Sequence, residues 1–200
     1  MSSLGSREPR QDRARLRVET LLAAAADLLR EEGLPALTMS AVAARAGSSL
    51  PSVYRYFPDR GALLYALAQR YLDEIHAEID QQLRGLRSRD DARTALVAVL
   101  DNYFRAFEED AALRHIWVGT LADPALNHLN VADSQRNGAL LADRLGPFTN
   151  LSDQSLLDRC VLASHLSHAT VTLALAVEPQ HGKRLIAEFG SWAELLLLAE

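Results

Sequence analysis

Residues 38–57 read TMSAVAARAGSSLPSVYRYF, and this stretch indicates how the N-terminal part of the chain folds. Thr38 is placed to cap a helix of about eight residues, Gly47 permits a tight turn, and a second helix of about seven residues follows. Two short helices joined by a glycine turn have the geometry of a helix-turn-helix. Val42 and Val53 are placed to face inward, which leaves hydroxyl and aromatic side chains on the outer surface.

Helical patterns continue on both sides of this stretch. Apolar residues recur at steps of three and four from Val18 onward, and Gly33 is placed to end that helix. Asp59 is placed to cap a long helix that reaches Leu83. Further helices are expected over residues 88–109, 111–121, 123–145, 152–178 and 183–200, with residues 179–182 as a connection. Because no segment alternates with period two, the sequence predicts an all-α protein of about nine helices.

The charge of the chain is divided unevenly along its length. The 200 residues carry a formal net charge of −5, which taken alone argues against a polyanionic partner. Residues 1–70 nevertheless hold ten arginines against seven acidic residues, whereas residues 71–200 carry a net charge of −8. This asymmetry indicates two tasks, although a GC-rich genome is an alternative explanation for the arginines.

The overall composition indicates a folded protein of the cytoplasm. Apolar residues make up 48% and charged residues 24%, which is typical of globular proteins. A single cysteine cannot form an internal disulfide, and no apolar run is long enough for a membrane span or a secretory leader. We therefore expect a cytoplasmic location and no membrane partner.

Residues 15–65 resemble the DNA-binding domain of the tetracycline-repressor (TetR) family of transcriptional regulators. The resemblance is carried by Gly33, Thr38, the segments AARAG (43–47) and VYRYF (53–57), Arg60, Leu63 and Leu64. It implies an N-terminal three-helix helix-turn-helix domain and a C-terminal helical domain for effector binding and dimerisation. We therefore expect a flexible arginine-rich arm over residues 1–14, a DNA-binding domain over 15–72 with its helix-turn-helix at 38–57, and an effector-binding and dimerisation domain over 73–200.

The resemblance also implies which residues contact DNA. Thr38, Tyr56 and Arg60 are expected to contact phosphates. The residues expected to read or abut base edges are Ser49, Leu50, Ser52, Tyr54 and Arg55. Leu50 has no hydrogen-bonding group, so contact with a thymine methyl is its natural role. Three alternatives stay open: Tyr54 fills space against the first helix, Arg45 is a DNA ligand or only an exposed helix residue, and the arm tracks DNA or is inert.

The acidic part of the chain contains no recognisable catalytic cluster, so we expect no enzyme, no cofactor and no metal site. Seven residues are expected to line an effector pocket: Tyr103, Phe104, Phe107, Trp117, His165, His168 and Thr172. Ordinary hydrophobic core is the alternative for the aromatic residues. His165 and His168 lie three residues apart on one helix face, and they are either a metal-binding pair or packed, hydrogen-bonded side chains.

The last two predicted helices are rich in apolar residues on more than one face. Such helices need burial on several sides, and two copies that pack as a four-helix bundle provide it. The residues expected at this homodimer interface are Val161, Leu173, Phe189, Trp192 and Leu196. A dimer also places two recognition helices about 34 Å apart, which matches successive major grooves of a palindrome.

These observations predict a DNA-binding transcriptional regulator, in particular a ligand-responsive repressor that binds palindromic operator DNA as a homodimer. Its expected partners are double-stranded operator DNA, an unidentified small-molecule effector and a second copy of the chain. One alternative is a helical small-molecule-binding or enzymatic protein with a vestigial helix-turn-helix. Another is an architectural DNA binder without an effector, which a C-terminal core without a pocket would favour. The effector, the operator, and the choice between repression and activation stay open.

Overall fold

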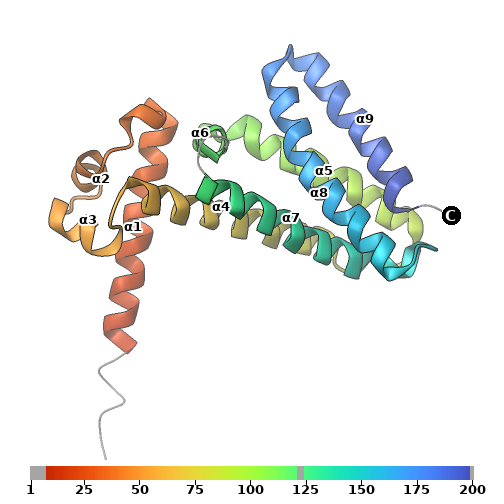
Figure 1. The fold of residues 1–200 in the computed structure, drawn as a ribbon, viewed down its shortest axis with the longest axis horizontal. Coiled ribbons are helices and arrows are strands. Elements are labelled where there is room, and N and C mark those ends of the chain that lie inside the picture. The colour runs from red at the N-terminus through yellow and green to blue at the C-terminus, as the bar shows by residue number, and fades with distance from the viewer. Residues whose placement is uncertain (1–7, 121–123, 199–200) are drawn as a thin grey trace, which may run out of the picture. The chain divides into compact units, whose positions relative to one another are not determined.

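A computed structural model describes residues 8–120 and 124–198, and within these ranges the chain forms nine α-helices, two short 3₁₀ helices and no strand (Figure 1). This confirms the predicted all-α class. The chain divides into two compact units: residues 1–70 with 110–122, and residues 71–109 with 123–200. None of the described helices is both long and apolar enough to span a lipid bilayer.

The first unit contains the predicted helix-turn-helix. Its elements are α1 (Glu8–Glu32), the 3₁₀ helix η1 (Leu34–Ala36), α2 (Met39–Arg45), α3 (Leu50–Tyr56), the beginning of α4 (Arg60–Gln82), and α6 (Ala111–Thr120). Thr38 caps α2 as predicted, because its Oγ1 accepts a hydrogen bond from Ala41 N at 3.1 Å. Val42 and Val53 are fully buried, so the inward faces of α2 and α3 also agree with the sequence pattern.

The first helix begins at Glu8, well before the predicted start at Val18. Residues 8–14 are therefore helical, and the expectation of a flexible arm is wrong for them, whereas residues 1–7 lie outside the described residues. Pro9 lies in the first turn, where its missing N–H costs nothing, and the arginine, glutamine and alanine residues that follow it favour helix. The apolar pattern could not show this segment because residues 8–14 contain no large apolar side chain.

Residues 110–122 belong to the first unit, although the sequence grouped them with residues 73–200. Arg30 on α1 donates from Nε to Asp110 Oδ1 at 3.0 Å and from a second nitrogen to Asp110 Oδ2 at 3.2 Å. Asp110 Oδ1 also accepts from Ala112 N at 2.8 Å and so caps α6. Arg30 and Asp110 lie 80 residues apart in sequence, so no local pattern connects them.

The second unit is a helical bundle. Its elements are the rest of α4, α5 (Arg89–Glu109), α7 (Pro124–Leu145), the 3₁₀ helix η2 (Gly146–Phe148), α8 (Asp153–Ala176) and α9 (Pro179–Leu197). Helix α8 packs against both α7 and α9, and α9 also packs against α5 (Figure 1). Ser88 and Asp91 form the predicted capping box at the start of α5: Asp91 N donates to Ser88 Oγ at 3.0 Å, and Ser88 N donates to Asp91 Oδ2 at 3.1 Å.

The connection predicted over residues 179–182 is wrong, because these residues form the first turn of α9. Glu178 caps the helix, and its carboxylate accepts from Gln180 N at 2.9 Å and from His181 N at 3.0 Å. These two hydrogen bonds hold the pKa of Glu178 below its usual value. Proline suits the first turn of a helix, and Gly182 allows α9 to approach the backbone of α8 closely at Ala174.

Candidate functional site

The outer face of α3 exposes side chains of several chemical kinds. Leu50, Tyr54 and Arg55 are exposed on this helix, and Val53 anchors its opposite face in the core. Tyr54 has 49% of its surface exposed, which agrees with the surface role and not with the alternative of filling space against the first helix. Ser49 is exposed and forms the N-terminal boundary of α3.

The residues predicted to contact phosphates surround this face. Tyr56 is half-buried, and its hydroxyl accepts a hydrogen bond at 3.3 Å from Arg55, whose guanidinium lies 5.0 Å from the centre of the Tyr56 ring. Arg60 donates to the carbonyl oxygen of Leu34 at 2.6 Å, so it also supports the turn before α2. Thr38 is exposed at the start of α2, where its oxygen serves as the helix cap.

Arg45 makes contacts within its own unit. It donates to Glu31 at 2.8 Å and lies 3.5 Å from Glu32, both near the end of α1. The hydrogen bond from Arg45 lowers the pKa of Glu31. These ion pairs connect α2 to α1, and contact between Arg45 and DNA stays a prediction.

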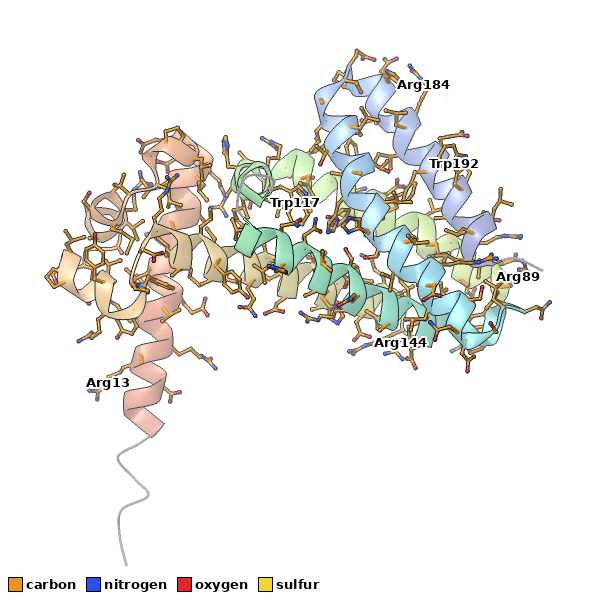
Figure 2. All side chains as sticks on the ribbon, in the orientation of Figure 1. Arg13, Arg89, Trp117, Arg144, Arg184 and Trp192 are labelled. Atoms are coloured by element: carbon orange, nitrogen blue, oxygen red, sulfur yellow. The ribbon has the colours of Figure 1, made fainter. Side chains whose placement is uncertain are left out.

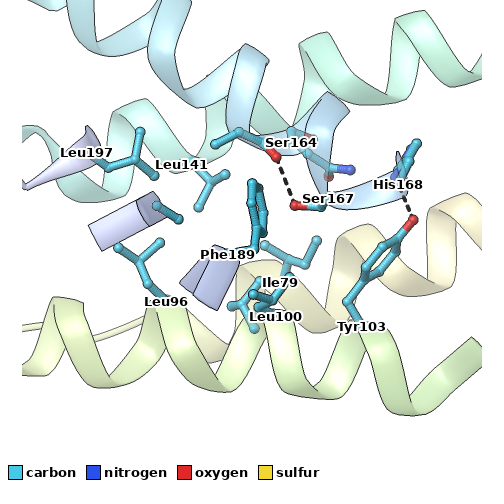
Figure 3. A pocket seen from close by; sticks show the side chains of 14 residues that line it. Ile79, Leu96, Leu100, Tyr103, Leu141, Ser164, Ser167, His168, Phe189 and Leu197 are labelled. Carbon is cyan, nitrogen blue, oxygen red and sulfur yellow. Dashed lines mark hydrogen bonds between the residues drawn. The ribbon is translucent and has the colours of Figure 1, made fainter. Parts of the chain in front are cut away.

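The second unit encloses a cavity of about 60 Å³ (Figure 3). Five helices contribute its lining residues: Ile79, Leu96, Val99, Leu100, Tyr103, Asn137, Leu141, Ala163, Ser164, Ser167, His168, Phe189, Ala193 and Leu197. One end is aliphatic, with Leu96, Leu141 and Leu197 close together, and the other end carries the hydrogen-bonded pair Tyr103 and His168 (Figure 3). The cavity therefore has an apolar end and a polar end.

Of the seven residues predicted for an effector pocket, Tyr103 and His168 line this cavity and the other five do not. Phe107 packs edge-on against the Tyr103 ring at 5.1 Å and belongs to the core. Trp117 is buried on α6 in the first unit. Phe104 borders a separate surface hollow beside Lys183.

His165 and Thr172 on α8 do not line the cavity. His165 is exposed, and its Nδ1 lies 3.0 Å from Ser134 Oγ. Thr172 donates its hydroxyl proton to the backbone oxygen of His168 at 2.9 Å. The Nδ1 atoms of His165 and His168 both take part in hydrogen bonds, which agrees with the packed, hydrogen-bonded alternative for this pair.

A chain of buried polar groups extends from the cavity wall. Tyr103 Oη lies 2.6 Å from His168 Nδ1, and His168 Nε2 lies 3.8 Å from Asp133 Oδ2. Asp133 Oδ2 accepts from Asn137 Nδ2 at 2.8 Å, and Asn137 Oδ1 lies 2.6 Å from His76 Nδ1. The chain thus connects α5, α8, α7 and α4 through groups that are mostly removed from water.

Burial sets the protonation of this chain. Burial raises the pKa of Asp133 to about 7, partly opposed by the charge of Arg136. Burial also lowers the pKa of His168 to about 3, so His168 is neutral at physiological pH. Tyr103 keeps its proton because burial raises its pKa well above the usual value.

Helices α8 and α9 expose a set of large apolar side chains. Leu162, Leu166, Leu173, Trp192 and Leu195 make up this set, which we call the apolar face. Trp192 and Leu195 have 61% and 74% of their surfaces exposed in the single chain. Figure 2 labels Trp192 on α9. An apolar surface of this kind is typical of an interaction site.

The five residues predicted for a dimer interface occupy three kinds of position. Leu173 and Trp192 lie on the apolar face, and Val161 and Leu196 are half-buried. Phe189 is buried and lines the cavity, so its assignment to the interface is corrected. Phe189 shares the apolar pattern of Trp192, and only the packing of α9 on α5 shows that it faces inward.

Comparison with known proteins identifies the family. Residues 21–67 match the family described as bacterial regulatory proteins, tetR family. Residues 90–199 match the family described as tetracyclin repressor-like, C-terminal domain. The chain belongs to the tetR family. Both parts of the expected TetR-type architecture are therefore present in the sequence.

Individual TetR-family proteins match over different lengths. The HTH-type transcriptional activator FasR of Mycolicibacterium smegmatis is 33% identical over 107 residues, which cover 54% of this chain but only 46% of FasR. The HTH-type transcriptional regulator BetI of Burkholderia cenocepacia is 31% identical over 140 residues, which cover 68% of each protein. A crystal structure of a TetR-family transcriptional regulator from Streptomyces coelicolor superposes with a TM-score of 0.73 and 29% identity, covering 94% of this chain and 99% of that one.

Sequence reasoning missed Asp133 and Asn137 of this TetR-family chain. They lie four residues apart on α7, and both are buried. Spacing of i and i+4 places two side chains on one helix face, so the shared face was available as a signal. The burial of these two side chains could not be read from the sequence, because it depends on the packing of α8 and α4 over that face.

We expect Asp133→Asn to stabilise the protein relative to the original chain by an amount that grows with pH. The folded pKa of about 7 lies above the value of about 3.9 in an unfolded chain, so the folded state retains the proton between these pH values. The contribution of the neutral Asp133 carboxyl group to the unfolding free energy is therefore fully present below about pH 4, and it is lost as the pH rises through 7. Asparagine stays neutral throughout.

Urea unfolding at several pH values measures this effect. Between pH 5 and pH 8 the difference in unfolding free energy is expected to grow by about 2 kcal/mol in favour of the variant. The low pKa of His168 makes the unfolding free energy rise with pH, which is opposite to the effect of Asp133. Both proteins contain His168, so the difference between them isolates Asp133. A difference that stays constant over this range contradicts the assignment of a buried, protonated Asp133.

Proposed function

We propose that this TetR-family protein is a ligand-responsive transcriptional regulator that binds palindromic operator DNA as a homodimer. The observation that carries the proposal is the exposed face of α3, with Leu50, Tyr54 and Arg55 on a helix anchored by the buried Val53. Repression is the proposed direction of control, because a dimer on its operator blocks access to the promoter. FasR is named as an activator, so the direction is a separate question from DNA binding.

The α3 face supports DNA recognition by its size and chemistry. A helix fits the major groove, which is about 12 Å wide, and the Arg55 guanidinium suits a guanine edge. Leu50 suits a thymine methyl. Thr38, Tyr56 and Arg60 border the same surface and are proposed to hold phosphates, which fix the orientation of the helix without reading sequence.

The apolar face of α8 and α9 supports dimerisation. Exposed leucines together with a tryptophan lose their contact with water when a second copy covers them, at roughly 25 cal/mol per Å² of apolar surface. A two-fold axis makes such an interface self-complementary. Two α3 helices then meet successive major grooves about 34 Å apart, which requires a palindromic operator.

The cavity supports effector control. Its volume of about 60 Å³ is small beside the 300–1,000 Å³ of typical ligand pockets, so a larger effector must move the helices that surround it. A ligand that binds only the widened state shifts the population toward that state. Helix α4 begins in the first unit and ends in the second, and the segment that contains α6 stands in the chain between two parts of the second unit. A movement of helices in the second unit is therefore passed along the backbone to the first unit.

A mobility-shift assay with the DNA that flanks the protein's own gene tests this function. We expect a specific shift at moderate salt, an apparent affinity that falls steeply as salt increases, and release of the DNA by an effector. Effector candidates come from a thermal-shift screen of metabolites and drugs, because a ligand of the folded state raises the melting temperature. If no specific shift forms at moderate salt, the proposed function is wrong.

We expect Arg55→Ala to weaken operator binding by about 10- to 100-fold and to relax specificity at one base pair of each half-site. The side chain is exposed, so unfolding free energy should change little. Arg105→Ala on α5 is the matched control, since it removes an exposed arginine from the second unit. Equal affinities for Arg55→Ala and the control would remove Arg55 from the recognition surface.

A further inference from the structure

The polar end of the cavity presents oxygen lone pairs to a ligand. Ser167 donates its hydroxyl proton to the carbonyl oxygen of Ala163 at 2.8 Å. Asp133 Oδ2 lies 3.8 Å from His168 Nε2, and a nearby carboxylate favours the tautomer with the proton on Nε2. His168 Nδ1 then accepts the proton of Tyr103 at 2.6 Å. The hydroxyl hydrogens of Ser167 and Tyr103 are thus engaged, and their oxygens are left to accept hydrogen bonds from a ligand.

A buried carboxyl group, Asp133, lies behind His168 and does not itself line the cavity. Asp133 is 95% buried, and among the described residues no group donates a hydrogen bond to its Oδ1. None of the described residues that line the cavity is lysine or arginine. Burial of the Asp133 carboxylate outweighs the favourable charge of Arg136, and a positive charge in the cavity offsets the remaining cost.

Other titratable groups around Asp133 do not supply this positive charge inside the cavity. Those facing it or its hydrogen-bonded neighbours from the packed helices are Asp73 and His76 on α4, Tyr103 on α5, Arg136 on α7, and His165 and His168 on α8. Arg136 forms an ion pair with Asp73 at the exposed side of α4 and α7. His168 is neutral, so it transmits the field of Asp133 and does not cancel it.

We infer that the effector of this cavity is an organic cation of the alkylammonium type, whose apolar body lies among Leu96, Leu141 and Leu197 and whose charged head faces Tyr103 and His168, with Asp133 as its counter-charge. The inference rests on the proposed role of the cavity as the effector site. An anionic ligand of the same shape meets acceptor oxygens and a carboxylate, so it is disfavoured.

Binding of such a cation is linked to the charge of Asp133. The cation interacts favourably with the carboxylate and not with the neutral carboxyl, so it lowers the pKa of Asp133 from about 7 when it binds. Affinity for the cation therefore rises between pH 6 and pH 8 and levels off above that range. An uncharged ligand of the same length shows no such rise.

The experiment uses the full chain and three probes of equal chain length: hexylammonium, hexan-1-ol and hexanoate. Calorimetry and thermal shift at pH 6 and pH 8 give the affinities. At pH 8 we expect hexylammonium to bind at least about tenfold more tightly than hexanoate, and to lose about tenfold in affinity at pH 6. Asp133→Asn should remove most of this preference, whereas Asp101→Asn, which neutralises an exposed carboxylate on α5, should keep it.

The inference is overturned if hexanoate binds as tightly as hexylammonium, if hexylammonium does not bind, or if Asp133→Asn keeps the full preference. The pH dependence of the original chain decides the matter if Asp133→Asn does not fold: an affinity for hexylammonium equal at pH 6 and pH 8 overturns it. These measurements contain no DNA. If the cation does not bind but the operator shift is intact, only the inference about the effector is wrong and the proposed regulator is retained. If the operator shift is absent but the cation binds, the proposed DNA-binding function is wrong and the inference about the effector is retained.

Discussion

Replacement of Gly138 by alanine is expected to destabilise the second unit by about 2–3 kcal/mol, although alanine is the better helix former. Helices α7 and α8 cross at this glycine. A Cβ atom there would stand 2.7 Å from Val161 Cα and 2.8 Å from Val161 N. Both neighbours are backbone atoms, so a rotamer change cannot relieve the overlap and the helices must separate. Thermal unfolding should show a fall in melting temperature of about 5–10 °C.

Gly190→Ala is the matched control for this prediction. Gly190 is also a buried glycine inside a helix, but a Cβ atom there would lie 3.6 Å from Leu100 Cδ2, an ordinary contact. The gain in helix propensity should then dominate and stabilise the protein by about 0.5–1 kcal/mol. Opposite signs for the two substitutions identify the α7–α8 crossing as the cause. If both glycines tolerate alanine equally, the close crossing at Gly138 is incorrect.

The double substitution Leu173→Glu and Trp192→Glu is expected to convert a dimer into a monomer. Leu173 on α8 and Trp192 on α9 are exposed in the single chain, so the monomer can keep its fold. In a dimer the four carboxylates would be buried together, which desolvation and repulsion oppose. Analytical ultracentrifugation should show a mass that falls from twice 22.0 kDa to 22.0 kDa.

The affinity for operator DNA should also fall, by about 100-fold or more, because each monomer then binds a half-site without the help of a linked second contact. Val97→Glu is the control, since Val97 is an exposed apolar residue on α5 outside the apolar face. It should leave both mass and operator affinity unchanged. A double variant that stays dimeric would place the interface elsewhere, and a monomeric variant with full affinity would contradict dimeric recognition.

Helix boundaries that depend on local hydrogen bonds were predictable. Thr38, Ser88 and Ser152 each cap the helix that follows them, as their positions in the sequence indicate. Glu178 was overlooked as a cap because glutamate is an uncommon residue at this position, and the following proline and glycine suggested a connection. The early start of α1 was also missed, since residues 8–14 contain no large apolar residue and so give no apolar pattern to read.

The two candidate sites differ in how far they could be predicted. Leu50, Tyr54 and Arg55 lie within six residues of one short helix, so helical spacing alone places them on one outer face. The cavity draws residues from five helices, and its lining depends on how far each helix is rotated about its axis. Tyr103 and His168 meet across 65 residues of sequence, and no periodicity along one helix reports such a contact.

The sequence by itself determined the helical class, the helix-turn-helix, its outer face and the division into a basic and an acidic part. Each of these follows from interactions between residues a few positions apart, or from composition, and a linear pattern records both. The tertiary structure alone decided that residues 110–122 join the first unit, that Phe189 faces the cavity, and that Asp133 is buried next to His168. Burial and pairing of this kind arise from packing between distant segments, where the surroundings of a side chain, and with them its pKa, are set by helices that lie far away in the sequence.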